Sequence, residues 1–261
     1  MVAGFVVLEL AQGGEELGII MHRVSLTVTA TTFLIIAALS AIRNASAESP
    51  DHNWNGWYIG GHGGYGLWPY TNSVRVDSVQ GLTAPGFQNT ASGWFGGMQF
   101  GLNYPVSPQI LAGIEADVSF AHIFDNILAP SGNPGASLSL IEKTIRGFGT
   151  LRGRIGWVNG DFLVFGTAGL AEINVSLKHT RVIGTLNFAT PGTTETVTAW
   201  KTGWTIGGGL EAAISQKWGI KTEYIYLRSF SRWSEFLPLS LVYSDRDLGF
   251  HTVRVGLNYR L

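Results

Sequence analysis

The feature that most constrains this chain is an alternation of large apolar residues with small or polar residues, which recurs in eight separate segments. A period of two is the mark of a β-strand whose two faces meet different surroundings. The third segment shows it plainly, because Ile114, Ala116 and Val118 alternate with Glu115 and Asp117. The eight segments are 57–67, 94–104, 110–120, 145–157, 162–177, 200–214, 218–226 and 252–261. The sequence therefore predicts an all-β fold of eight long strands.

The fifth segment changes phase along its length. Val164 and Leu170 share one parity, whereas Ile173 and Val175 share the other. One extra residue in a strand reverses the side to which the following side chains point. We therefore expect a β-bulge near Ala171.

The residues between the apolar ones indicate which face meets water. They are mainly Gly, Thr and Asn with a few charges, and charged residues make up only 13% of the chain, against about a quarter in soluble domains. A soluble barrel also has alternating strands, but its outer face needs a polar coat that these small residues do not supply. We therefore expect the apolar parity to face hydrocarbon and the small polar parity to face the barrel interior.

The connections between the eight segments alternate in length. Long connections rich in Gly, Pro, Ser, Thr, Asn or Asp cover 69–92, 121–142, 178–198 and 229–249, whereas short turns cover 105–108, 158–161 and 215–217. Outer-membrane barrels have short periplasmic turns and long external loops. Residues 48–261 are thus predicted to form an eight-stranded antiparallel up-and-down transmembrane β-barrel with both ends in the periplasm.

Aromatic residues gather at the predicted strand ends. Trp and Tyr are enriched where a membrane meets water, so two aromatic girdles are expected. The residues at the turn ends are Trp57, Tyr104, Trp157, Trp218 and Tyr259, and those near the loop ends are Trp94, Trp200 and Tyr226.

The N-terminal region has the layout of a secretory signal over residues 21–47. Arg23 follows Met21, an apolar run covers 24–42, and a small-x-small cleavage site ends at Ala47. These are the three parts of an export signal. A membrane anchor is the alternative, but Ser and Thr dilute the first half of the apolar run. Residues 1–20 are expected to be an upstream extension, with translation starting at Met21.

Composition excludes several function classes. The absence of Cys excludes disulfide scaffolds, Cys-ligated metals and thiol nucleophiles. The formal net charge of −1 leaves no basic footprint for phosphate backbones, so nucleic acid is not an expected partner. No cofactor is expected either.

Seven motifs in order along residues 54–261 carry a resemblance to a known family. They are Trp54-Asn-Gly-Trp-Tyr-Ile-Gly-Gly, Gly113-Ile-Glu-Ala-Asp, Leu151-Arg-Gly-Arg-Ile-Gly-Trp, Phe165-Gly-Thr-Ala-Gly-Leu-Ala, Gly203-Trp-Thr-Ile-Gly-Gly-Gly-Leu-Glu, Lys221-Thr-Glu-Tyr and Val253-Arg-Val-Gly-Leu-Asn-Tyr-Arg-Leu. Together they resemble the small alphaproteobacterial outer-membrane barrels of the porin-like or outer membrane immunogenic protein group, related to opacity proteins and the OmpA transmembrane domain. The resemblance implies a place in the outer membrane of a Gram-negative cell, among outer-membrane lipid and lipopolysaccharide, and it supplies no catalytic residue.

The C-terminal segment looks like the signal that the barrel-assembly machinery reads in such proteins. Arg254, Gly256, Tyr259 and the terminal Leu261 match that signal, although the family usually ends in Phe. The assembly machinery is therefore an expected partner.

Charged residues on the inward parity are the main candidates for chemistry. An eight-stranded barrel is just wide enough for side chains to fill, so these charges are expected to pair with one another and to plug the interior rather than line an ion path. The ion-pair candidates are Glu115, Asp117, Arg146, Arg152, Arg154, Glu211, Lys221, Glu223 and Arg254, with Lys201 and Arg260 on the same parity.

Other motifs do not support a catalytic reading. The Gly-x-Gly-x-x-Gly pattern at 61–66 matches a dinucleotide fingerprint, but no helix start follows it. His62 beside it is expected to be a satisfied interior polar group. A lipid A-modifying enzyme is a minor alternative, with only His122 and His179 at loop edges as candidates. The chain is therefore predicted not to be an enzyme.

Three functions are compatible with this sequence. A structural and surface-display barrel with at most low-conductance passage is favoured. A general diffusion porin and a loop-based adhesin or receptor for a surface ligand or host factor are the alternatives, since external loops of about 20 residues are long for plain connectors.

Overall fold

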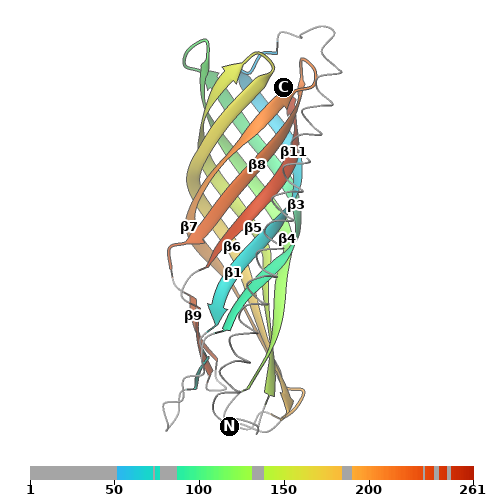
Figure 1. Cartoon of the computed structure of the whole chain (residues 1–261), viewed down its shortest axis with the longest axis vertical. Coiled ribbons are helices and arrows are strands. Elements are labelled where there is room, and N and C mark those ends of the chain that lie inside the picture. The colour runs from blue at the N-terminus through green and yellow to red at the C-terminus, as the bar shows by residue number, and fades with distance from the viewer. Residues whose placement is uncertain are drawn as a thin grey trace, which may run out of the picture. The chain divides into compact units, whose positions relative to one another are not determined.

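The computed structural model describes residues 52–72, 74–76, 87–130, 138–183, 190–231, 233–237, 241–245 and 248–261. Eight strands form the barrel: β1 (Gly56–Asn72), β3 (Phe87–Pro105), β4 (Ile110–Pro130), β5 (Leu138–Asn159), β6 (Phe162–Ile183), β7 (Thr194–Ala213), β8 (Trp218–Ser229) and β11 (Gly249–Arg260). Their order around the closed ring is β1, β11, β8, β7, β6, β5, β4, β3 (Figure 1). All pairings are antiparallel, so the predicted eight-stranded up-and-down barrel is confirmed.

The N-terminal predictions are not addressed by this structure. The upstream extension at 1–20 and the export signal at 21–47 lie outside the described residues. No helix in the described part of the chain is long and apolar enough to cross a membrane.

Short turns close one end of the barrel, as the sequence predicted. Only Gly160 and Asp161 separate β5 from β6, and Gly160 has a φ of 58°. Glycine adopts this left-handed conformation without steric cost, which suits a two-residue hairpin. The end of β11 lies at this same end of the barrel (Figure 1).

The strands are longer at the other end than a membrane requires. Crossing a bilayer takes about 9–11 tilted residues, whereas β4, β5, β6 and β7 contain 21, 22, 22 and 20 residues. The predicted loop boundaries at 121–142 and 178–198 were therefore wrong, because strand pairing continues to Pro130 and Ile183. Outside the membrane a strand carries polar residues on its outer face, so its composition is that of a loop.

A second, small sheet lies in the two connections that follow β1 and β8. It contains β2 (Val74–Val76), β9 (Trp233–Leu237) and β10 (Leu241–Asp245), in the order β2, β10, β9. Two long connections therefore pair with each other instead of remaining separate loops.

The expected phase change in β6 has a different cause. Odd-numbered residues of β6 face the interior from Leu163 to Arg181, and the pairing of β6 with β7 has no register shift. The predicted bulge near Ala171 was therefore wrong. The irregularity lies in β5, where the registers with both β4 and β6 shift between Ile145 and Gly147.

Glycines on the inward face of β1 make room for close packing. A Cβ added at Gly64 would lie 2.6 Å from the Phe95 ring and 2.3 Å from the carbonyl oxygen of Val253. The Gly-x-Gly-x-x-Gly pattern at 61–66 thus lies inside a strand. Of its three defining glycines only Gly66 faces the crowded interior, where an added Cβ would lie 2.3 Å from Ile123. Gly61 and Gly63 face outward, and an added Cβ there would make only an ordinary contact at 3.8 Å, so the expectation that the glycines relieve interior crowding was wrong for these two.

Candidate functional site: the barrel interior

The barrel interior holds three layers of side chains, stacked from the turn end to the loop end. We call them the inner apolar layer (Trp54, Leu111, Leu163, Phe165 and Ala213), the ionic layer (Glu115, Asp117, Arg152, Arg154, Glu211, Lys221, Glu223, Arg254 and Arg260) and the outer apolar layer, defined below. Each layer draws side chains from several strands, so the ring of strands decides which groups meet.

Strand register brings the charges of the ionic layer into opposite pairs. Glu115 of β4 lies across from Arg152 of β5, and Glu223 of β8 lies across from Arg254 of β11. Glu211 of β7 likewise faces Lys221 of β8. Facing side chains on adjacent strands interact directly, so each pairing matches opposite charges.

Glu115 is the centre of this layer. Its carboxylate accepts hydrogen bonds from the Tyr58 hydroxyl at 2.6 Å and from Lys221 Nζ at 2.8 and 3.0 Å. It also pairs with Arg152, and with Arg254 at 3.2 Å. Three cations from three different strands therefore converge on one buried carboxylate.

Arg152 and Arg254 link Glu115 to two further carboxylates. Arg152 pairs with Glu223, and with Asp117 at 3.0 Å. Arg254 donates to Glu223 from Nε at 2.9 Å and from Nη2 at 2.7 Å. Each guanidinium therefore bridges several carboxylates. The planar guanidinium is suited to this because it carries several hydrogen-bond donors in a fixed geometry.

A second group of the ionic layer surrounds Glu211 near the turn end. Arg154 donates to it at 2.5 Å and the amide of Asn258 at 2.9 Å, while Arg260 lies 3.7 Å away. Arg260 also covers the ring of Trp54, with 4.6 Å between the guanidinium carbon and the ring centroid. This group joins the ionic layer to the inner apolar layer.

The structure brings eight of the nine ion-pair candidates together, and it also places Arg260 with them. Arg146 is the exception: the irregularity in β5 turns it outward, where it is exposed, so its predicted interior position was wrong. Lys201 keeps the inward parity but is only half-buried and, within the described residues, forms no ion pair.

His62 is held by polar neighbours within the interior. Its ring nitrogens lie 3.1 Å from the Gln99 amide oxygen and 2.8 Å from the Ser119 hydroxyl. Within the described residues the ring hydrogen-bonds to an amide and a hydroxyl and not to a carboxylate, so His62 is not part of a His–carboxylate pair.

The two histidines considered for catalysis lie on opposite faces of the wall. His122 faces outward and is exposed, whereas His179 faces inward and is buried. Within the described ranges, no group of three His, Asp or Glu residues could hold a metal ion. The geometry therefore gives no support to the lipid A-modifying alternative.

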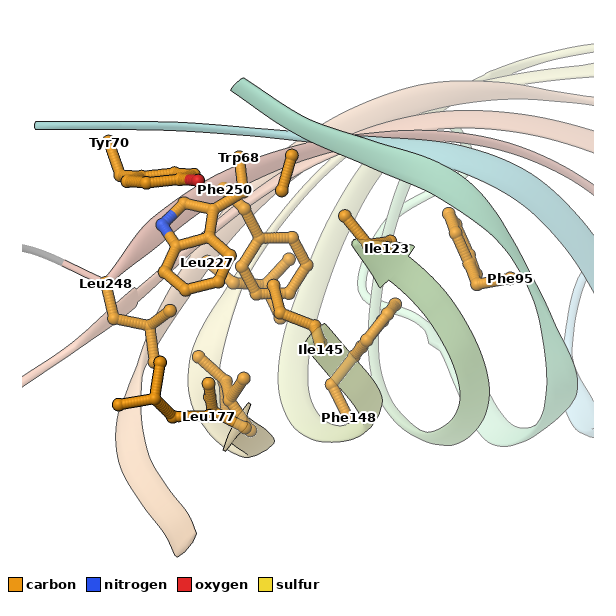
Figure 2. Packing of buried hydrophobic residues seen from close by; sticks show 14 of the residues in the cluster. Trp68, Tyr70, Phe95, Ile123, Ile145, Phe148, Leu177, Leu227, Leu248 and Phe250 are labelled. Atoms are coloured by element: carbon orange, nitrogen blue, oxygen red, sulfur yellow. The ribbon is translucent and has the colours of Figure 1, made fainter. Parts of the chain in front are cut away.

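The outer apolar layer was not predicted from the sequence. Figure 2 shows its packing, in which Phe148 of β5 contacts Phe95 of β3 and Phe250 of β11 with ring centroids 5.2 and 5.4 Å apart. Because β5 and β11 lie on opposite sides of the ring, this contact crosses the whole interior. The layer consists of Trp68, Tyr70, Ala91, Phe95, Ile123, Ile141, Ile145, Phe148, Ala171, Ile173, Val175, Leu177, Ile225, Leu227, Leu248 and Phe250.

The segment before β1 covers the turn end of the barrel. Trp54 Nε1 donates to the carbonyl of Gly160 at 3.0 Å, and His52 Nδ1 donates to the carbonyl of Ser215 at 2.8 Å. The two rings also meet edge to face. The segment thereby spans two different turns and adds Trp54 to the inner apolar layer.

Acidification is expected to loosen this segment. Burial and the nearby Arg260 lower the pKa of His52 below its ordinary value near 6.5, and these outweigh Glu211 and Asp161, which raise it. The neutral His52 ring is thus favoured when the segment before β1 is packed on the turns. The contribution of His52 to this packing is therefore present above about pH 6.5 and is lost as pH falls through the lowered pKa. Amide protection factors at residues 53–55, which are exchange rates corrected for the intrinsic pH dependence of exchange, should be higher at pH 7.5 than at pH 5. His52→Gln, which does not titrate, should remove this difference; an equal difference in that variant contradicts the assignment.

The aromatic girdles appear on the outer face as predicted. At the turn end, Trp57 stacks on Phe100 and Trp218 meets Tyr259. Toward the loop end, Trp94 meets Tyr65 and Trp204 meets Tyr226. Trp204 is an additional member of the second girdle.

The C-terminal residues are divided between the two faces of β11. Arg254 belongs to the ionic layer, Tyr259 belongs to the turn-end girdle, and Leu261 is exposed with its N–H donating to the carbonyl of Trp57 at 3.1 Å. Gly256 packs beside the carbonyl of Gly61. Recognition of this segment by the assembly machinery stays a prediction.

Comparisons with known proteins agree with this architecture. The family model described as outer membrane protein beta-barrel domain matches residues 31–260. The chain is 31% identical over 218 residues to the 31 kDa outer-membrane immunogenic protein of Brucella melitensis. This alignment covers 80% of this chain and 84% of that relative. It is 29% identical to the 22 kDa outer membrane protein of Rhizobium leguminosarum, with coverage of 68% and 65%.

Solved structures to which the chain is similar include the outer membrane protein OprG of Pseudomonas aeruginosa, at 13% identity and a TM-score of 0.48, with coverage of 81% of this chain and 100% of that one. Neisserial surface protein A is similar at 10% identity and a TM-score of 0.42, with coverage of 78% and 97%. The family match and the Brucella relative identify the chain, which is a member of the outer membrane protein beta-barrel family and resides in the outer membrane.

Proposed function

We propose that this protein is a structural and surface-display barrel whose interior is closed to solute flow. The observation that carries the proposal is the stack of three buried layers, because the ionic layer and the outer apolar layer both connect strands across the ring. Arg152 of β5 pairs with Glu223 of β8, and Phe148 of β5 contacts Phe250 of β11. Eight strands leave an interior that side chains can fill completely. The role is non-catalytic, since every carboxylate of the ionic layer is held by a guanidinium or ammonium group.

The long external part of the barrel supports display. Strands β4 to β7 run well past the length that spans a membrane, so the loop ends of these strands stand away from the lipid. Binding functions are commonly carried by loops on such a scaffold. Recognition of a surface ligand or host factor is therefore the second candidate function, and binding assays after shortening the connection between β6 and β7 test it.

A general diffusion porin is the less favoured alternative. An aqueous path would have to separate the ion pairs of Glu115 and also pass the aromatic contacts around Phe148. A porin of larger strand number needs neither change, because its lumen is wide enough for water.

Planar-bilayer recording separates the closed barrel from the porin. The protein purified from outer membranes, folded as judged by its heat-dependent gel shift, is expected to give no stable conductance steps. An open porin inserted into the same bilayers is the positive control. Reproducible steps that disappear in Glu115→Gln would favour the porin and contradict the closed interior.

A further inference from the structure

The outward position of Arg146 has no structural role in the interior, and it gives the outer wall an exposed cation. Among the residues that the structure describes, the side chain of Arg146 forms no ion pair or hydrogen bond, and it is exposed. It lies at the irregularity of β5, between the paired rows Phe120–Gly147 and Ile123–Ile145. Bulges commonly re-aim one side chain. Without the irregularity in β5, Arg146 would point into the apolar core and Ile145 would point outward.

The distance along β5 places Arg146 at the outer edge of the hydrocarbon. Eleven residues separate it from Trp157 of the turn-end girdle. A strand that rises about 3.3 Å per residue and tilts by about 35–45° advances roughly 26–30 Å over this length. The apolar band of an outer-membrane barrel is about 25 Å tall. Arg146 therefore lies just beyond the acyl chains, at the depth of the headgroups of the outer leaflet.

Neighbouring side chains on the same outer face complete a polar patch. His122 lies in the two-residue interval of β4 opposite Arg146, between the paired rows on either side, and Thr144 and Asn174 lie on β5 and β6 at the adjoining outward positions. All three can donate hydrogen bonds. Below them toward the membrane, Phe120 is 79% exposed. A polar group that meets Arg146 would thus have an apolar surface directly beneath it.

The acidic residues on this face are engaged elsewhere. Glu142 pairs with Lys178 at 2.6 Å, and Glu172 accepts a hydrogen bond from Thr202 at 2.7 Å. Neither is within ion-pair distance of Arg146. The cation is therefore available to an anion that comes from outside the protein.

We propose that Arg146, with His122, Thr144 and Asn174, binds a phosphate of an outer-leaflet glycolipid while Phe120 contacts its acyl chains. Arginine suits this ligand because its planar guanidinium donates two parallel hydrogen bonds to phosphate oxygens. The commitment is to a lipid and not to free phosphate, since the cation stands at headgroup depth above an apolar wall. The proposal does not depend on whether the interior conducts.

Native mass spectrometry of the protein purified from outer membranes tests this assignment. In detergent micelles, wild-type protein should bind diphosphoryl lipid A saturably, and Arg146→Gln should weaken that binding roughly ten-fold or more, as expected for a charged hydrogen bond. Lys217→Gln is the matched control, because it removes one positive charge at the turn end, where Lys217 lies 5.4 Å from the Tyr259 ring. The control should bind as wild type does.

Other outcomes of this experiment would overturn the proposal. Equal binding by Arg146→Gln would exclude Arg146 as the contact, and an equal loss in Lys217→Gln would reduce the effect to net charge. Equal affinity for lipid A from which both phosphates have been removed would exclude phosphate as the recognised group. If inorganic phosphate displaces lipid A completely at millimolar concentration, the site recognises free phosphate and the lipid assignment is wrong. The heat-dependent gel shift of each variant checks that it is folded.

Discussion

Replacing Arg152 with alanine is expected to lower the free energy of unfolding by about 3–5 kcal/mol. Arg152 is 1% exposed and pairs with Glu115, Asp117 and Glu223. The substitution leaves three buried carboxylates with one fewer cation and opens a space that no neighbour fills. A fall in the urea midpoint of the detergent-folded protein, followed by the heat-dependent gel shift, measures the effect.

Arg146→Ala is the matched control for that substitution. It removes the same side chain from the same strand six residues away, but from an exposed position, where substitutions usually change stability by less than about 0.5 kcal/mol. A wild-type midpoint for Arg152→Ala would exclude a buried ion-pair network. Equal losses in the two variants would mean that both arginines stabilise the barrel in the same way, contrary to this structure.

The membrane-spanning half of the barrel was predictable from the sequence because one rule covers it. Through most of the span between the two girdles, the strands turn apolar residues to lipid and small or polar residues inward, as in Ile114 and Glu115 of β4. The inner apolar layer, with Leu163 and Phe165, departs from this rule. The turns are short and begin where this alternation ends. The pairing of Glu115 with Arg152 followed from strand adjacency alone.

The external half was not predicted because the rule reverses there. Beyond the membrane the outer face meets water, so Glu172 and Lys178 of β6 face outward while Ile173 and Val175 face inward. This reversal, rather than a bulge, explains the change of phase that the sequence shows at Ala171. The strand is continuous, and its surroundings change from lipid to water.

Arg146 was predicted to face the interior for a different reason. In β6 the surroundings of the strand change, whereas in β5 the backbone register itself changes at Arg146. The run Ile145-Arg146-Gly147 has no residue that must adopt an unusual conformation, so nothing in the sequence indicates an irregularity. Only the registers with β4 and β6 reveal it. A shift of one residue exchanges the two faces of a strand, and it therefore moves a charge from the core to the lipid boundary.

The second large loss of stability is expected in the outer apolar layer, where apolar side chains face inward beyond the membrane. Phe148→Ala is expected to lower the free energy of unfolding by about 3–5 kcal/mol, as is usual for truncation of a buried phenylalanine. Phe148 is 1% exposed, and its ring meets those of Phe95 and Phe250. The variant loses contacts with β3 and with β11, so no single strand can move to fill the space. The urea midpoint in detergent again measures the loss.

Phe148→Leu is the control, because it keeps most of the volume and is expected to cost less than about 1.5 kcal/mol. The variants also test whether the layers close the barrel independently. The ionic layer should remain intact in Phe148→Ala, since Arg152 and Glu115 lie in a different layer, so the variant should be less stable yet still give no conductance steps. Stable steps in Phe148→Ala would mean that the outer apolar layer alone closes the interior. An unchanged midpoint would mean that Phe148 does not pack across the barrel.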